Sequence, residues 1–163
     1  MRFPIGNRGG AYIAVIVFIT ILVIWFIRSA HAEDTHVYLR GGSAFGPGGA
    51  APVLGIDARH ALGPQLDFYA GTLLWGENRL TSNNWDWHAG LRTCRWNVCA
   101  NIGAAYVQRI DTLNGSHTNF NLGLSYEFNW HRISSIDYAH LSNAGTISPN
   151  NGRNAALVAI QLQ

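Results

Sequence analysis

The sequence predicts an all-β protein: an eight-stranded antiparallel transmembrane β-barrel of the outer-membrane type, preceded by an N-terminal signal peptide. Two observations carry this prediction. After residue 33, hydrophobic residues alternate with polar or small ones, as in strands that have one apolar face. Turn residues interrupt the pattern at regular intervals, and short turns alternate with longer loops. The 18 glycines and the low charged fraction of 12% argue against both a helical bundle and a disordered chain.

The first 32 residues have the features of a secretory signal peptide. Arg2 and Arg8 precede an uncharged, mostly apolar run over residues 11–27, and the A-x-A arrangement of Ala30-His31-Ala32 offers cleavage after Ala32. An uncleaved membrane anchor stays open as the alternative, because this run is near the lower length limit of a spanning helix. In both cases the positive-inside rule predicts that residues 33–163, the barrel, are exported.

The charge of the exported part gives no reason to expect a nucleic-acid partner. The whole chain has a formal charge of +2, and residues 1–32 contain three arginines and no acidic residue. Removing them leaves a formal charge of −1, so the basic character of the sequence belongs partly to the leader.

Eight segments have the strand pattern, and residues 85–92 show it most clearly. There Trp85, Trp87, Ala89 and Leu91 alternate with polar or small residues. The predicted strands are 36–46, 52–62, 66–76, 84–95, 98–109, 118–129, 132–142 and 153–163. The longer connections are 46–49, 76–83, 110–117 and 143–152, and the short ones are 63–64, 96–97 and 130–131.

The apolar faces are expected to meet lipid, while the faces rich in Gly, Asn and Ser fill the lumen. A soluble β-sandwich or lipocalin-like barrel, with its apolar face inside, is the alternative. If the short turns are periplasmic, both termini are periplasmic and the long loops lie at the cell surface. The aromatic residues expected near the membrane interfaces are Trp85, Trp87, Tyr106, Phe120, Tyr126 and Phe128.

Two cysteines and two histidines are expected to have structural roles. Cys94 and Cys99 flank the short turn 96–97 and should face each other across the hairpin, where a disulfide could form in an oxidising compartment. A zinc site is not indicated, because two cysteines without nearby histidines do not form a closed site. His60 and His88 are expected on lumen faces as packed or hydrogen-bonded residues.

His140 and Ser142 form the clearest candidate for chemistry. Residues two positions apart on a strand point the same way, with Cα atoms roughly 6.5 Å apart, so the histidine could assist the serine. Asp137 has the opposite parity and belongs in the lumen. The His140–Ser142 pair is therefore expected to face lipid, where polar groups are costly and indicate function.

The residues His140-Leu141-Ser142-Asn143-Ala144-Gly145 and Pro149-Asn150-Asn151-Gly152 resemble the signature of the lipid A 3-O-deacylase (PagL) family of eight-stranded outer-membrane hydrolases. The resemblance implies a serine esterase that hydrolyses the 3-O-linked acyl chain of lipid A, the anchor of lipopolysaccharide, in the outer leaflet. Ser142 would be the nucleophile and His140 the general base. The side chain of Asn143, the backbone N–H of Gly145 and Asn150 would be oxyanion or positioning groups. No cofactor and no metal is implied.

Asn154 departs from the family pattern, which has a glutamate at this position. A neutral amide can orient the histidine through a hydrogen bond, but it cannot stabilise the imidazolium by charge. The sequence therefore predicts a slow or specialised esterase. A non-catalytic relative and a phospholipid esterase stay open, as does a homodimer. Arg79, Arg109 and Arg153 are expected at the surface end, where they either contact lipid A phosphates or are solvated.

Overall fold

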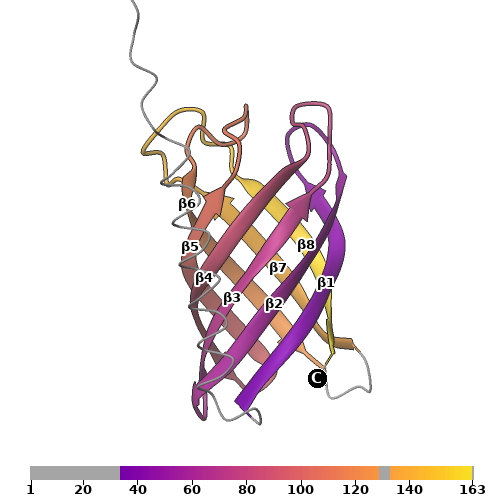
Figure 1. Cartoon of the computed structure of the whole chain (residues 1–163), viewed down its shortest axis with the longest axis vertical. Helices are drawn as coiled ribbons and strands as arrows, with labels where there is room; N and C mark the ends of the chain where they lie inside the picture. Colours follow the sequence, from indigo (N-terminus) through magenta and orange to yellow (C-terminus); the bar gives the residue numbers. More distant parts are fainter. Residues whose placement is uncertain (1–33, 129–132, 163) are drawn as a thin grey trace, which may run out of the picture. The chain divides into compact units, whose positions relative to one another are not determined.

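The computed structural model describes residues 34–128 and 133–162, and within them eight antiparallel strands form a closed barrel in sequence order (Figure 1). The first and last strands pair with each other and close the wall. The strands are β1 (Thr35–Phe45), β2 (Ala51–Gly63), β3 (Leu66–Trp75), β4 (Asn84–Arg95), β5 (Val98–Val107), β6 (Thr118–Glu127), β7 (Ile133–Ser142) and β8 (Arg153–Gln161). The predicted eight-stranded antiparallel barrel is confirmed.

The longer connections gather at one end of the barrel, the upper end in Figure 1, and the short turns at 64–65 and 96–97 lie at the other. The longer ones are residues 46–50, 76–83, 108–117 and 143–152. The predicted signal peptide lies outside the described residues, as do the predicted strand ends at 129, 132 and 163. Among the described residues, no helix has the length and apolar character needed to cross a membrane.

The outer face of the wall is apolar. Large hydrophobic side chains from all eight strands are exposed there, among them Leu54, Ile102, Leu122, Leu124 and Ile136. A water-soluble barrel would bury such residues in its interior, whereas a membrane barrel presents them to lipid. The exposure of these apolar side chains on the outer face therefore favours the membrane barrel over the soluble alternatives. The predicted interfacial residues Trp85, Trp87, Phe120 and Tyr126 are among those exposed outward.

The lumen is filled by paired charged side chains. Arg40 contacts Asp57 at 2.7 Å and Asp137 at 3.2 Å. His88 lies between two carboxylates, with Nε2 at 3.0 Å from Asp57 and Nδ1 at 2.6 Å from Asp86. Burial of a charge is costly unless it is paired and hydrogen-bonded, so these contacts let a narrow polar lumen exist. The prediction of a hydrogen-bonded, lumen-facing His88 is confirmed.

His60 corrects a prediction of sidedness. It shares the parity of Leu54 and Ile56, which are exposed on the outer face, whereas Asp57 and Arg59 are buried in the lumen. His60 and Arg59 are adjacent and cannot both point inward. Arg59 takes the inward position, where it lies 3.5 Å from Asp137.

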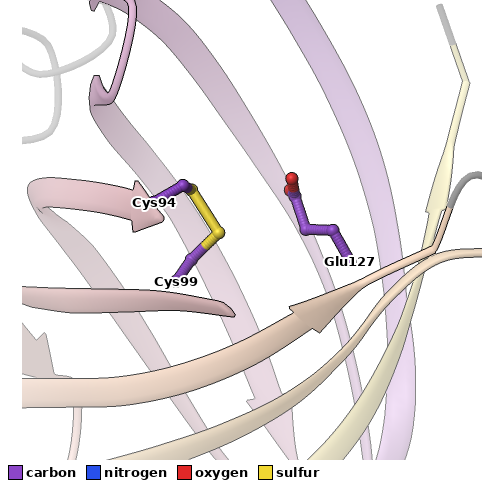
Figure 2. A group of neighbouring side chains, drawn as sticks. All are labelled: Cys94, Cys99 and Glu127. Atoms are coloured by element: carbon purple, nitrogen blue, oxygen red, sulfur yellow. A yellow bond between two sulfur atoms is a disulfide. The ribbon is translucent and has the colours of Figure 1, made fainter. Parts of the chain in front are cut away.

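The disulfide between Cys94 and Cys99 is present. The two residues are direct partners across the β4–β5 hairpin, with their Cα atoms 4.0 Å apart. Figure 2 shows the bridge with Glu127 nearby. The guanidinium of Arg92 lies 2.9 Å from Cys94 Sγ and 2.7 Å from Glu127 Oε1. Because the sulfurs are bonded to each other and a cation already neutralises the carboxylate, this group is poorly suited to hold a metal ion.

Candidate active site

Strand β7 directs His140 and Ser142 outward. Its alternate residues Ser135, Asp137, Ala139 and Leu141 are buried on the lumen side. Ile136 and Tyr138 are exposed on the other side, and His140 and Ser142 continue that outward row as half-buried residues. The alternation of β7 thus places both side chains on the outer face of the wall. The charge of Asp137 decides which face of β7 points inward, because Asp137 contacts the buried Arg40 in the lumen.

Asn154 lies beside His140 on the same outer face. The two residues are direct partners between β7 and β8, and His140 Nδ1 is 2.8 Å from Asn154 Oδ1. An amide oxygen carries no hydrogen, so the ring nitrogen is the donor. The neutral imidazole then has its lone pair on Nε2, the atom that a general base uses. The structure thus brings Asn154 and His140 together on one face.

Ser142 is held by the loop that follows it. Its hydroxyl donates to Asn150 Oδ1 at 3.1 Å and accepts from the backbone N–H of Ala144 at 3.1 Å. Within residues 34–128 and 133–162, the Ser142 hydroxyl makes no hydrogen bond to His140. The strand brings the two side chains to one face, and the serine proton is directed to Asn150 instead of to the histidine. Catalytic hydrogen bonds often tighten only when substrate binds.

Asn143 and Gly145 shape the turn after the serine. The buried Asn143 side chain accepts from the N–H of Gly145 at 3.0 Å and donates to the carbonyl of Ile147 at 2.7 Å. Ala144 and Gly145 both have positive φ angles, 53° and 77°, and such a turn needs local hydrogen bonds to hold it. The donors that the sequence assigned to an oxyanion hole are thus engaged within the loop.

Asn150 presents its oxygen, and not its amide nitrogen, toward the serine. Oδ1 accepts from the Ser142 hydroxyl and from the backbone N–H of Asn143, both at 3.1 Å. Asn150 therefore acts on the serine as an acceptor. The N–H of Ala144, a residue to which the sequence assigned no role, donates to the serine oxygen.

A neighbouring loop supports the loop that carries Asn150. Residue Asn114 in the loop 108–117 forms an isolated β-bridge with Asn150. The N–H of Gly115 donates to the carbonyl of Pro149 at 2.8 Å, and the N–H of Asn151 donates to Leu113 at 2.9 Å. The serine is thus positioned by a segment about 30 residues away in sequence, for which the sequence gives no signal.

Gly152 makes room for the histidine ring. A Cβ at this position would lie 2.8 Å from His140 Cε1 and 3.0 Å from the carbonyl oxygen of Leu141. Gly152 also has a φ of 67°, in the left-handed region that favours glycine. The glycine of the sequence motif therefore sets where the imidazole can lie.

Arg153 does not point toward the membrane surface. It is buried on the lumen side, where it forms an ion pair with Asp111. The expectation that it contacts phosphate groups or solvent is wrong, because it shares its parity with Ala155 and Leu157, which are also buried. Arg79 and Arg109 are exposed in loops at the end expected to be extracellular.

A closed eight-stranded barrel with an apolar outer face and a filled polar lumen is a transmembrane barrel of the kind found in bacterial outer membranes. The family model for lipid A 3-O-deacylase (PagL) matches residues 54–163. The chain therefore belongs to the lipid A 3-O-deacylase (PagL) family. Its predicted localisation in the bacterial outer membrane is confirmed by this family membership and by the fold.

Solved structures share the fold at low sequence identity. The structure described as "Crystal structure of the outer membrane enzyme PagL" matches with a TM-score of 0.61 and 16% identity, covering 77% of this chain and 97% of that chain. A structure from "De novo design of transmembrane beta-barrels" matches with a TM-score of 0.45 and 12% identity, covering 77% and 92%. No curated protein sequence matches the chain.

Gly152→Ala should displace the His140 ring. The added methyl group would meet the imidazole and the backbone, and a left-handed φ costs a residue with a Cβ about 1–2 kcal/mol. We expect the Nδ1–Oδ1 hydrogen bond to Asn154 to lengthen beyond 3.5 Å in a crystal structure of the variant.

Gly63→Ala is the matched control, because a Cβ at Gly63 has no neighbour within 4 Å. It should leave the imidazole in place. An unmoved ring in Gly152→Ala would show that the site has more space around His140 than the contacts indicate.

Proposed function

We propose that this protein hydrolyses the ester-linked acyl chain at the 3-position of lipid A, with Ser142 as nucleophile and His140 as general base. The proposal is carried by the placement of Ser142, His140 and Asn154 together on the lipid-facing side of the wall. A lipid A molecule in the outer leaflet would reach this site laterally, with its acyl chains against the apolar outer face. Membership of the deacylase family supports the same reaction.

Acylation of the enzyme would begin when His140 Nε2 accepts the Ser142 proton. The hydroxyl oxygen attacks the ester carbonyl carbon and a tetrahedral oxyanion forms. Collapse of this intermediate breaks the bond to the sugar oxygen, and Nε2–H returns the proton to that oxygen. Water, deprotonated by Nε2, then attacks the acyl-serine carbonyl carbon; the bond to the serine oxygen breaks, Nε2–H returns the proton to that oxygen, and the fatty acid leaves.

The loop after Ser142 would supply oxyanion stabilisation and positioning. The N–H of Ala144 donates to the nucleophile oxygen, so it would stabilise negative charge on that oxygen as its proton leaves; to serve as an oxyanion donor it would have to turn to the former carbonyl oxygen once the ester is attacked. Asn143 and Gly145 would hold that N–H in place through their mutual hydrogen bond. Asn150 would hold the serine hydroxyl before substrate arrives and release it when the proton moves to His140.

Asn154 would orient the histidine and leave its charge uncompensated. Its oxygen fixes the tautomer that has a free Nε2. An imidazolium forms during each proton transfer, and a neutral amide stabilises it less than a carboxylate does. We therefore propose a slow or specialised enzyme. All residues of the proposed site come from one chain.

Ser142→Ala should abolish fatty-acid release from lipid A. We expect purified protein in detergent to release a 3-hydroxy fatty acid, seen by mass spectrometry as the loss of one acyl chain from lipid A. Ser43→Ala is the matched control, since Ser43 is an outward-facing serine on β1 whose hydroxyl donates to backbone carbonyls. It should retain activity.

Three outcomes would contradict this proposal. Unchanged lipid A spectra with the active protein would favour a non-catalytic barrel. Release of fatty acid from phospholipid alone would favour a phospholipid esterase. Full activity in Ser142→Ala would exclude this serine as the nucleophile.

Asn154→Asp should raise kcat by at least about tenfold. Aspartate keeps the length of asparagine, so its carboxylate can keep the 2.8 Å contact to His140 Nδ1 while adding the charge that stabilises imidazolium; the reverse change in a serine protease costs about 10⁴ in kcat. Steady-state assays on lipid A measure the change.

The double variant Ser142→Ala/Asn154→Asp is the control for this gain. It should be inactive, which would show that the higher rate passes through the same serine. A lower rate in Asn154→Asp would mean that the histidine is not used as a base in the proposed orientation.

A further inference from the structure

We infer that Tyr138 is a positioning residue that holds the Asn154 amide in the orientation required by His140. The inference rests on the proposed function, in which His140 Nε2 acts as the base. The Tyr138 hydroxyl donates to Asn154 Oδ1 at 2.7 Å, and the same oxygen accepts from His140 Nδ1 at 2.8 Å. Two donors on neighbouring outward positions of β7 therefore converge on one oxygen of β8.

The geometry of the two strands explains why tyrosine can reach this oxygen. Tyr138 pairs directly with Ala156, and His140 pairs with Asn154, so the tyrosine meets Asn154 along the diagonal, within reach of a long side chain. The small side chain of Ala156 leaves space for the ring. Phe45 of β1, which pairs with Asn154 on the other side, packs against the ring of Tyr138 with centroids 6.2 Å apart.

An amide needs such positioning, and a carboxylate does not. A carboxylate offers an acceptor oxygen whichever way it turns, whereas asparagine has an acceptor at one end and a donor at the other. If the Asn154 amide turned over, its NH₂ group would donate to His140 Nδ1. The neutral ring would then carry its proton on Nε2, and that nitrogen could not accept the proton of Ser142.

The tyrosine hydroxyl disfavours the turned amide. In the observed orientation Oδ1 faces Tyr138 and His140, and Nδ2 lies on the side of Gly46. After a turn, the tyrosine proton would lose this acceptor on a wall that faces hydrocarbon, where an unpaired polar group is costly. Tyr138 thus favours one of the two orientations that the Asn154 amide could adopt.

Tyr138→Phe tests this inference, because it removes the hydroxyl and keeps the ring. We expect ¹⁵N NMR of histidine-labelled protein in detergent micelles to show His140 changing from the Nδ1–H form to a mixture of both neutral tautomers. Loss of a hydrogen bond of typical net strength predicts about a fivefold lower kcat, with KM changed less than twofold. Tyr126→Phe removes a tyrosine hydroxyl elsewhere on the outer face and should change neither quantity.

The Asn154→Asp background provides the decisive comparison. There the acceptor no longer depends on the orientation of the group, so Tyr138→Phe should leave the His140 tautomer unchanged and lower kcat by less than twofold. A purely structural role for Tyr138 would give the same loss in both backgrounds.

Two results would overturn the inference: a His140 that keeps its proton on Nδ1 in Tyr138→Phe, or an equal loss of kcat in the two backgrounds. The tautomer is measured without substrate. Failure of the proposed function, seen as a wild-type protein that releases no fatty acid, is therefore distinguishable from failure of this inference.

Discussion

The placement of the candidate site depends on one constraint, the separation of charge from lipid by a closed wall of alternating residues. Each strand directs successive side chains to opposite faces, and a buried charge needs a partner. Asp137 meets Arg40 and Arg59 in the lumen. The side chains on either side of Asp137 must then face outward, and the same alternation extends along β7 to His140 and Ser142.

In this barrel the side chains that stabilise the fold and those proposed to react with substrate lie on opposite faces of the wall. The lumen contains a network of charged pairs that fills the space inside the strands. The outer wall combines apolar side chains with a small polar cluster at the end of β7 and the start of β8. A substrate that lies in the membrane can reach such a cluster without entering the barrel, so the filled lumen is no obstacle to catalysis on the outside.

Much of the fold could be predicted from the sequence, because alternation and turn residues are local signals. The predicted strands agree with the observed ones to within two residues wherever both lie in the described part of the chain. The sequence pattern assigns His60 and Arg153 to the wrong environment, and the reason differs between the two residues. Arg59 and His60 are adjacent polar residues, and only the contact between Arg59 and Asp137 decides which one faces inward. The position of Arg153 near a strand end predicts a surface site, whereas its side chain shares the buried face of Ala155.

The sequence identifies which residues form the candidate site, but it does not predict the hydrogen bonds between them. Strand pairing brings His140 next to Asn154, and parity could anticipate this. The contact of Ser142 with Asn150 depends on a loop whose conformation is held by residues 113–115, and sequence offers no rule for such loop–loop contacts. Parity with His140 accounts for the outward position of Tyr138, but its hydrogen bond to Asn154 arises from a diagonal approach across Ala156.

The outward orientation of the candidate site is tested most directly by measuring whether neighbouring positions at the end of β7 are exposed to lipid. Spin labels attached to Ser142→Cys and, separately, to Leu141→Cys can be compared in lipid bilayers by electron paramagnetic resonance, using collisions with oxygen dissolved in the membrane. An outward-facing Ser142 predicts high oxygen accessibility for the label at position 142 and low accessibility at position 141, where Leu141 is 1% exposed on the lumen side. A label at 142 shielded from oxygen, with the label at 141 exposed to it, would contradict the outward orientation of the site.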